Sequence, residues 1–141
     1  MQSRTTNEEG FKIPAYLSFD IGNVEQHSFD TCNDFGLSFS FDNCILNYSS
    51  FYGRKIKKTF FKDSQLQETD FTKCDLTSAV FDNCDLTRAI FDNVNMEKAD
   101  FRTSFNYSID PEINQIKKAK FSLRGISGLL DKHDIEVERD I

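Results

Sequence analysis

The sequence has no tryptophan, only 6 glycines and only 2 prolines among its 141 residues. Glycine and proline supply most tight turns, so their scarcity disfavours sandwiches and barrels built from many hairpins. No run of 18 apolar residues is present, which argues against a membrane-spanning helix. No long apolar run follows a basic start in the first 20 residues, so we expect no signal peptide. A single-domain cytoplasmic protein is the interpretation that fits these absences.

Recognisable catalytic and metal-binding motifs are also missing. The histidines, His27 and His133, are far apart and neither lies in a ligand motif. The four cysteines lack the paired spacing of a zinc site, and we interpret them as reduced thiols: Cys32, Cys44, Cys74 and Cys84. The net charge of −6 disfavours direct binding to nucleic-acid phosphates. We therefore expect no enzyme activity, no cofactor, no metal and no direct nucleic-acid partner.

What the sequence does contain is 15 phenylalanines arranged with a period of five. The segment 74–83 is repeated almost unchanged as 84–93. Stepping by five residues meets a large apolar side chain thirteen times in succession, at Phe41, Leu46, Phe51, Ile56, Phe61, Leu66, Phe71, Leu76, Phe81, Leu86, Phe91, Met96 and Phe101. Such self-similarity at a fixed period is the signature of a repeat architecture.

A period of five fits neither an α-helix, at 3.6 residues, nor a flat strand, at 2. It fits a chain that turns a corner every five residues, with the large residue and a small residue two positions earlier pointing inward. Four corners would close a coil of twenty residues, and stacked coils would pair as parallel strands. Phe121 then continues the column of Phe41, and Ile116 continues that of Ile56. The predicted structural core is the set of these centres, apart from Ile56, together with Phe121.

Three segments carry a resemblance to a known family: Cys74-Asp75-Leu76, Cys84-Asp85-Leu86 and Ala99-Asp100-Phe101. They resemble the Ala/Cys-Asp-Leu/Phe-x-x motif of pentapeptide-repeat proteins, over residues 39–103 and again at 119–121. The resemblance implies an all-β fold, a right-handed quadrilateral β-helix.

The chain is expected to divide into three parts. Residues 1–18 form a flexible lead-in, residues 19–123 form the β-helix (regular over 39–103), and residues 124–141 form a C-terminal cap. The phase of the repeat slips by two before Phe41, which predicts an irregular coil at Cys32–Leu37. Arg54 occupies a normally small inward position, so we expect a distorted corner at residues 53–55.

The cap is predicted to be a short helix followed by a strand. Ile126, Leu129, Leu130 and His133 have helical spacing, and Ile135 and Val137 alternate as in a strand. An end of a solenoid needs covering, so capping alone would explain this segment. Quinolone-resistance members of the family end in a similar way, and that end is their dimer contact. The resemblance therefore implies an alternative role as a homodimer contact, through Ile126, Leu129, Leu130, Ile135 and Val137.

Charged clusters have ordinary explanations in this pattern. Asp82, Asp85, Asp92 and Asp100 lack the spacing of a calcium loop, and the repeat itself prescribes Asp before the centre. Two basic groups are either solvated edges or docking patches: Arg54, Lys55, Lys57, Lys58 and Lys62, and then Lys117, Lys118 and Lys120.

The predicted function is a non-enzymatic interaction scaffold with an unidentified protein partner. The alternative, implied by the resemblance, is a DNA-mimicking protein that binds DNA gyrase or topoisomerase IV and protects it from quinolones or toxins.

Overall fold

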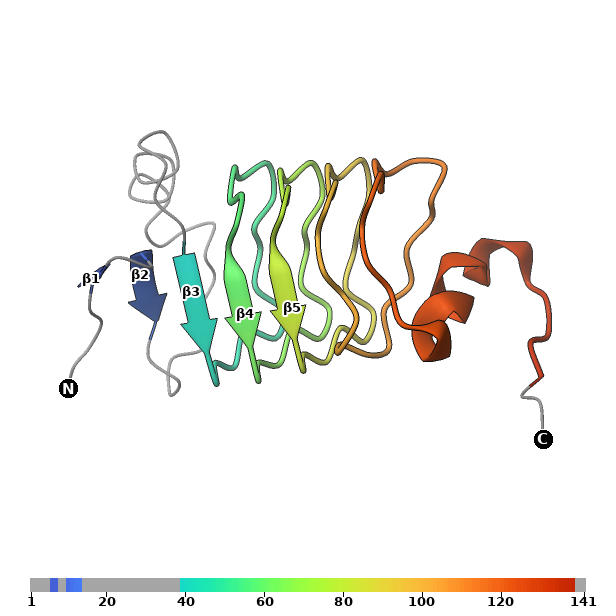
Figure 1. Ribbon diagram of the computed structural model, residues 1–141, viewed down its shortest axis with the longest axis horizontal. Coiled ribbons are helices and arrows are strands. Elements are labelled where there is room, and N and C mark those ends of the chain that lie inside the picture. Colours follow the sequence, from blue (N-terminus) through green and yellow to red (C-terminus); the bar gives the residue numbers. More distant parts are fainter. Residues whose placement is uncertain (1–5, 8–9, 14–38, 139–141) are drawn as a thin grey trace.

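The computed structural model describes residues 6–7, 10–13 and 39–138. The described strands form one sheet in the order β1-β2-β3-β4-β5. Their bounds are Thr6–Asn7 for β1, Gly10–Ile13 for β2, Phe39–Asp42 for β3, Phe60–Lys62 for β4 and Val80–Asp82 for β5. The pairing of β1 with β2 is antiparallel, and the other three pairings are parallel. Figure 1 shows β3, β4 and β5 side by side on successive coils of a rod.

Successive coils are offset by twenty residues. Phe61 lies opposite both Phe41 and Phe81 in the strand register. The same offset recurs in three further series of parallel bridges, which begin at Ile45, Ser50 and Lys55. Each coil therefore makes four contacts with the next, one for every five residues, as the period in the sequence predicted.

After twelve of the thirteen buried centres, the chain turns where the residue two positions later takes a positive φ. On the side that carries β4 and β5, these residues are Asp63 at 52° and Asn83 at 56°. Short polar side chains tolerate this left-handed region better than most. The residue before the centre supports the same turn, because the Asp75 carboxylate accepts a hydrogen bond of 3.1 Å from the backbone N–H of Thr77. This role explains why the repeat places Asp there.

All thirteen centres of the repeat are buried. The Phe81 ring stacks between Phe61, at a centroid distance of 4.7 Å, and Phe101, at 4.8 Å. It also meets Phe71 edge to face at 5.8 Å. Two phenylalanine columns thus interlock at right angles along the rod, in a geometry that aromatic rings favour. Phe121 is partly buried and ends one column, 5.4 Å from Phe101.

The small inward residues bind the coils together through hydrogen bonds. The Ser104 hydroxyl donates to the carbonyl of Phe81 at 2.6 Å and accepts from the N–H of Cys84 at 3.1 Å. Asn114 does the same half a coil further on, donating to Phe91 and accepting from Val94, each at 2.8 Å. Buried polar groups are stabilising only when paired in this way.

The corner predicted to be distorted at residues 53–55 is regular, so that prediction is wrong. Gly53 takes a φ of 71° without strain, and the N–H of Arg54 donates to the carbonyl of Phe51 at 2.9 Å. The Arg54 side chain is only half-buried, which lets the coil keep its shape. The irregular coil predicted at Cys32–Leu37 lies outside the described residues. Within the predicted lead-in, the described residues form β1 and β2.

The C-terminal part contains two 3₁₀ helices, η1 (Leu123–Leu129) and η2 (Asp131–His133). The Ser122 hydroxyl caps η1 by accepting from the N–H of Gly125 at 3.1 Å. The strand predicted at Ile135–Val137 is absent from the described part of the chain, and both side chains are exposed. A strand needs a neighbour to pair with, and the chain after η2 leads away from the coils (Figure 1).

Candidate interaction surfaces

In the described coils, the interior is packed with apolar and small side chains. Cys44, Cys74 and Cys84 are buried at small inward positions. The Cys74 thiol donates to the carbonyl of Phe51 at 2.8 Å. Burial raises the pKa of the Cys74 and Cys84 thiols to about 12, which keeps them protonated and unreactive. These cysteines therefore serve as compact packing groups.

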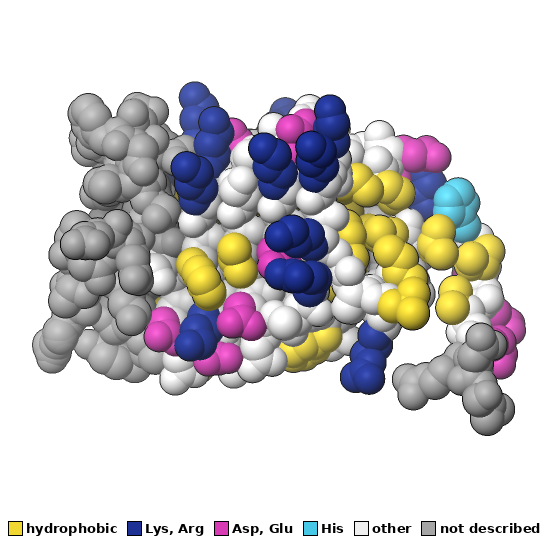
Figure 2. All heavy atoms as spheres, viewed as in Figure 1, with side chains coloured by type: hydrophobic (Ala, Val, Ile, Leu, Met, Phe, Trp, Pro, Cys, Tyr) yellow, Lys and Arg dark blue, Asp and Glu magenta, His cyan; other side chains and the backbone are white. Residues whose placement is uncertain are grey.

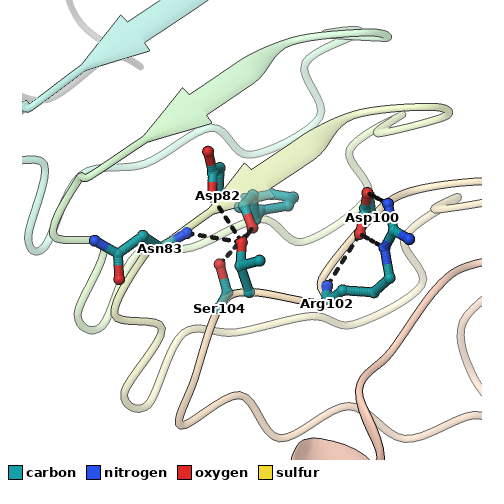
Figure 3. A network of polar contacts seen from close by, with 7 residues as sticks. Asp82, Asn83, Asp100, Arg102 and Ser104 are labelled. Carbon is teal, nitrogen blue, oxygen red and sulfur yellow. Dashed lines mark hydrogen bonds and ion pairs between the residues drawn. The ribbon is translucent and has the colours of Figure 1, made fainter.

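Polar side chains on the outer surface are engaged in bonds between neighbouring coils. The hydroxyl of Thr103 donates to the Asp82 carboxylate at 2.8 Å and accepts from the N–H of Asn83 at 3.0 Å. Figure 3 shows Asp82, Asn83 and Ser104 gathered in this network. These residues belong to coils stacked on each other, as does Ser104 beside them. The network therefore holds coil to coil, which is a structural use of an acidic side chain.

Two other acidic side chains from the repeat, those of Asp85 and Asp100, are also hydrogen-bonded to neighbouring side chains. Arg102 donates to the Asp100 carboxylate at 2.8 and 3.0 Å, and these hydrogen bonds hold the pKa of Asp100 below its ordinary value (Figure 3). Asp85 accepts from Gln67 of the preceding coil at 2.9 Å. The described residues contain no group of three or more side chains that could hold a metal ion.

The remaining chemical candidates do not assemble into a site. His133 is exposed on η2, and His27 lies outside the described residues. A groove beside η1 is lined by Arg88, Arg102 and Arg124, among others. Arg88 is paired with Glu68 at 3.0 Å, and Arg102 is paired with Asp100. No helix of the described chain is long and apolar enough to cross a membrane.

Exposed aromatic and aliphatic side chains are distributed over the outside of the rod. Tyr48 is 70% exposed, and Tyr52 lies within 5.9 Å of the Lys73 ammonium group. Five more large apolar side chains are exposed on the coils: Ile45, Phe60, Ile90, Phe105 and Ile113. Tyrosine is enriched at protein interfaces, so these positions are candidate protein contacts.

A second apolar surface covers the C-terminal part, where Figure 2 shows hydrophobic side chains gathered. Of the five residues predicted as a dimer contact, four are exposed: Ile126, Leu130, Ile135 and Val137. Leu129 is buried and belongs to the core of the cap. Leu123, which the sequence pattern missed, is 90% exposed. We call the five exposed residues the C-terminal apolar patch.

The lysines gather on one side of the rod. Parallel bridges stack residues 54–58, 74–78, 94–98 and 114–118 on one another, and we call these four segments the lysine face. It holds seven basic and two acidic side chains, a net charge of +5, in a chain of net charge −6. In Figure 1 the segments that lead into β4 and β5 lie at the upper edge, where Figure 2 shows Lys and Arg side chains.

The period of twenty could have predicted this face from the sequence. Lys57 and Lys117 appear as separate basic groups along the chain, but they are three coils apart and therefore lie in the same column. Aligning the charged residues with a period of twenty places both groups together with Lys98.

Comparisons with known proteins agree with this architecture. Residues 64–102 match the family model described as pentapeptide repeats, in eight copies. A trypsin-treated variant of QnrB1, described as a plasmid-mediated fluoroquinolone resistance protein, is similar to this chain with a TM-score of 0.61 at 14% identity. That match covers 73% of this chain and 50% of the QnrB1 chain, so the chain spans about half of its length.

A further solved structure is a pentapeptide repeat protein, Rfr23, from the cyanobacterium Cyanothece 51142. It is 17% identical with a TM-score of 0.26, and the match covers 61% of this chain and 62% of that one. Among curated proteins, none matches the sequence.

Proposed function

Because the chain is a pentapeptide-repeat protein, we propose that it is a non-catalytic interaction scaffold, a rigid rod whose outer sides bind a protein partner. One observation carries this proposal. The inward positions are filled by apolar side chains and by polar groups hydrogen-bonded between the coils, so recognition is left to the outer surface. We take the coil to be the right-handed, four-sided β-helix of the family, which would fix the outward side chains in regular columns.

Protein contact is proposed for the positions of exposed tyrosine. Tyr48 and Tyr52 stand on a backbone that is paired to the next coil, through N–H groups of Tyr48 and Gly53 that donate to Gln67 and Thr72 at 2.9 Å. A pre-ordered aromatic side chain loses little entropy on binding, which favours affinity.

Photo-crosslinking in cells tests this scaffold role. A photoreactive amino acid placed at Tyr48 or at Tyr52 should trap the same discrete protein, whereas one at Ser78, on the lysine face, should not. Trapping of no discrete protein from either tyrosine position would reject a protein-binding role for this surface.

We further propose that the C-terminal apolar patch joins two copies of the chain. Ile135 and Val137 are exposed in an extended segment that has no strand partner among the described residues. Pairing with the same segment of a second copy would bury both side chains and satisfy the backbone. Light scattering on a chromatography column should give the mass of a dimer, and Leu123→Asp or Ile135→Asp should give a monomer. Leu129 is unsuitable for this test, because its burial in the cap makes a substitution disruptive by itself.

A second candidate function is protection of a type II topoisomerase. The observation that favours it is the likeness in fold to QnrB1, a fluoroquinolone resistance protein. Outside the lysine face, residues 39–123 hold ten acidic and five basic side chains, a net charge of −5 that a DNA-binding surface would attract. A gyrase supercoiling assay with a fluoroquinolone tests this function directly. Restored supercoiling with added protein is expected, and no effect at micromolar protein would reject it.

A further inference from the structure

The fold places most basic side chains on one face and most acidic side chains on the others, a separation that the net charge of the chain does not show. The lysine face carries +5, and the remaining sides of residues 39–123 carry −5. Electrostatic attraction at physiological salt acts over about 8 Å, so a binding partner responds to the face that it meets. The expectation from net charge that the chain avoids nucleic-acid phosphates therefore does not apply to this face.

Most of its lysines are available for a ligand. An ion pair on this face joins Lys57 to Asp75, at 3.8 Å. The other five lysines are exposed and form no ion pair with the described carboxylates: Lys55, Lys58, Lys98, Lys117 and Lys118. Their charges are therefore not neutralised by acidic neighbours on the same face.

The stacking of coils turns three of these lysines into a ridge. Lys58 and Lys98 each follow a buried centre by two positions, Lys118 follows the partly buried Ile116 in the same way, and all three have φ values of 61° or 62°. Asparagine occupies the equivalent corners on other sides, at Asn83 and Asn93, and suits a positive φ better than lysine does. At these corners the backbone conformation favours asparagine, yet the residue is lysine. Each lysine side chain is exposed at a corner of the rod.

The composition of the face identifies the kind of partner. Its outward positions hold lysine with Asp, Glu, Asn, Gln, Ser and Thr, and no apolar side chain. Protein interfaces are poor in lysine and depend on buried aromatic and aliphatic contacts, which this face cannot provide. Phosphate backbones are bound mainly by lysine and arginine charges, without apolar contact.

We propose that the lysine face binds the sugar–phosphate backbone of a nucleic acid, without reading its base sequence. Backbone N–H groups order the ridge, because the N–H of Lys98 donates to the carbonyl of Lys117 at 3.0 Å and that of Lys58 donates to Thr77 at 2.9 Å. The backbone that carries the lysine side chains is therefore already ordered before a phosphate binds. This surface is separate from the exposed tyrosines and from the C-terminal apolar patch, so its test is independent of the proposed function.

Fluorescence anisotropy with labelled DNA of mixed sequence tests the proposal. Affinity should fall steeply between about 50 and 200 mM salt, with a log–log slope of about −4 for four or five neutralised phosphates. Parallel titrations with duplex DNA, single-stranded DNA and single-stranded RNA show which form of the backbone binds most tightly. The double variant Lys98→Glu/Lys118→Glu should lower the affinity at least about tenfold and flatten the slope by about 2.

A matched control changes the charge equally elsewhere. Lys62→Glu/Lys73→Glu alters two exposed lysines off the lysine face, and Lys73 has the same φ of 62°. It should change the affinity by no more than about twofold, since it removes no phosphate contact. Circular dichroism melts establish that both variants remain folded. Absence of binding at low salt, or equal losses in the two variants, would overturn the proposal. So would competition by polyglutamate as effective as that by unlabelled DNA, since it would identify an acidic protein as the partner.

Discussion

At the scale of single residues, each five-residue unit contributes one large and one small side chain to the interior. Phe81 has ring neighbours above, below and at right angles, so nothing nearby can move into its place. Phe81→Ala should therefore lower the free energy of unfolding by about 3–5 kcal/mol. Urea denaturation measures the loss, with Phe60→Ala as the control because Phe60 is exposed on the adjacent position. A loss below about 1 kcal/mol for Phe81→Ala would contradict its place in the column.

The buried thiols give the protein a dependence on alkaline pH. In the unfolded chain a thiol ionises near pH 8.5, whereas burial keeps Cys74 and Cys84 protonated up to about pH 12. Their contribution to stability is complete below pH 8.5 and is lost as pH rises toward 12, by up to about 1.4 kcal/mol per pH unit for each thiol. Denaturation between pH 8 and 10 measures the slope.

Cys74→Ala/Cys84→Ala is the control for this effect, since Ala79 and Ala89 hold equivalent positions in the same coils. The double variant should show a flatter pH profile. An unchanged profile would mean that other groups, such as lysines or tyrosines, set the alkaline limit.

At the scale of elements, the contact between η1 and the last coil depends on two glycines. A Cβ on Gly128 would collide with the backbone carbonyl of Tyr107, and one on Gly125 would collide with the Tyr107 ring. The N–H of Ile109 also donates to the carbonyl of Gly128 at 3.0 Å. The Tyr107 carbonyl belongs to the backbone, and the bond between Ile109 and Gly128 holds the two segments together, so neither segment can easily move aside for a methyl group.

Gly128→Ala should therefore loosen the cap and lower the free energy of unfolding by about 1–3 kcal/mol. Thermal melting followed by circular dichroism measures this change. Ser127→Ala, in the same helix and only partly buried, should cost much less. Equal losses in the two variants would show that a substitution anywhere in η1 has this effect, and that the close contact with Tyr107 does not decide it.

The elements were only partly predictable from the sequence. The period of five is long and regular, and it led to parallel strands and the phenylalanine columns. Spacing alone predicted a helix in the cap, but the close approach of Gly128 to Tyr107 was not visible in it. The prediction of a strand at Ile135–Val137 was wrong. Alternating apolar residues indicate which side chains share one face of a strand, but they do not show whether a neighbouring strand is present to pair with it.

At the scale of the whole molecule, stability should vary along the rod, because only inner coils have neighbours on both sides. Amide hydrogen exchange should be slowest in the middle, for example at Phe71 and Leu76, whose N–H groups donate to Ile90 at 2.9 Å and Asn95 at 2.7 Å. The N–H of Phe101, which donates to Lys120 in the last coil at 2.8 Å, should exchange faster. Equal protection at the three amides would mean that the rod opens as one unit.

The charge distribution also belongs to this scale, and the sequence hid it for a definite reason. Net charge sums over all sides of the rod, although the coil places basic and acidic side chains on different sides. Residues that are close in sequence can also lie on different sides. Lys58 and Lys98 are forty positions apart yet share a column, whereas Lys58 and Lys62 are close in sequence and lie on different sides.

Phenylalanine columns alternate with aliphatic columns around the coil, so the packing inside is the same after half a turn. An insertion or deletion of ten residues during evolution would return every ring to a ring column and could leave the interior intact. The same event would carry half of the lysine face to the opposite side of the rod. Only insertions or deletions of a whole twenty-residue coil preserve both the ring columns and the lysine face. If the lysine face is needed for function, the chain can gain or lose length only in units of twenty residues.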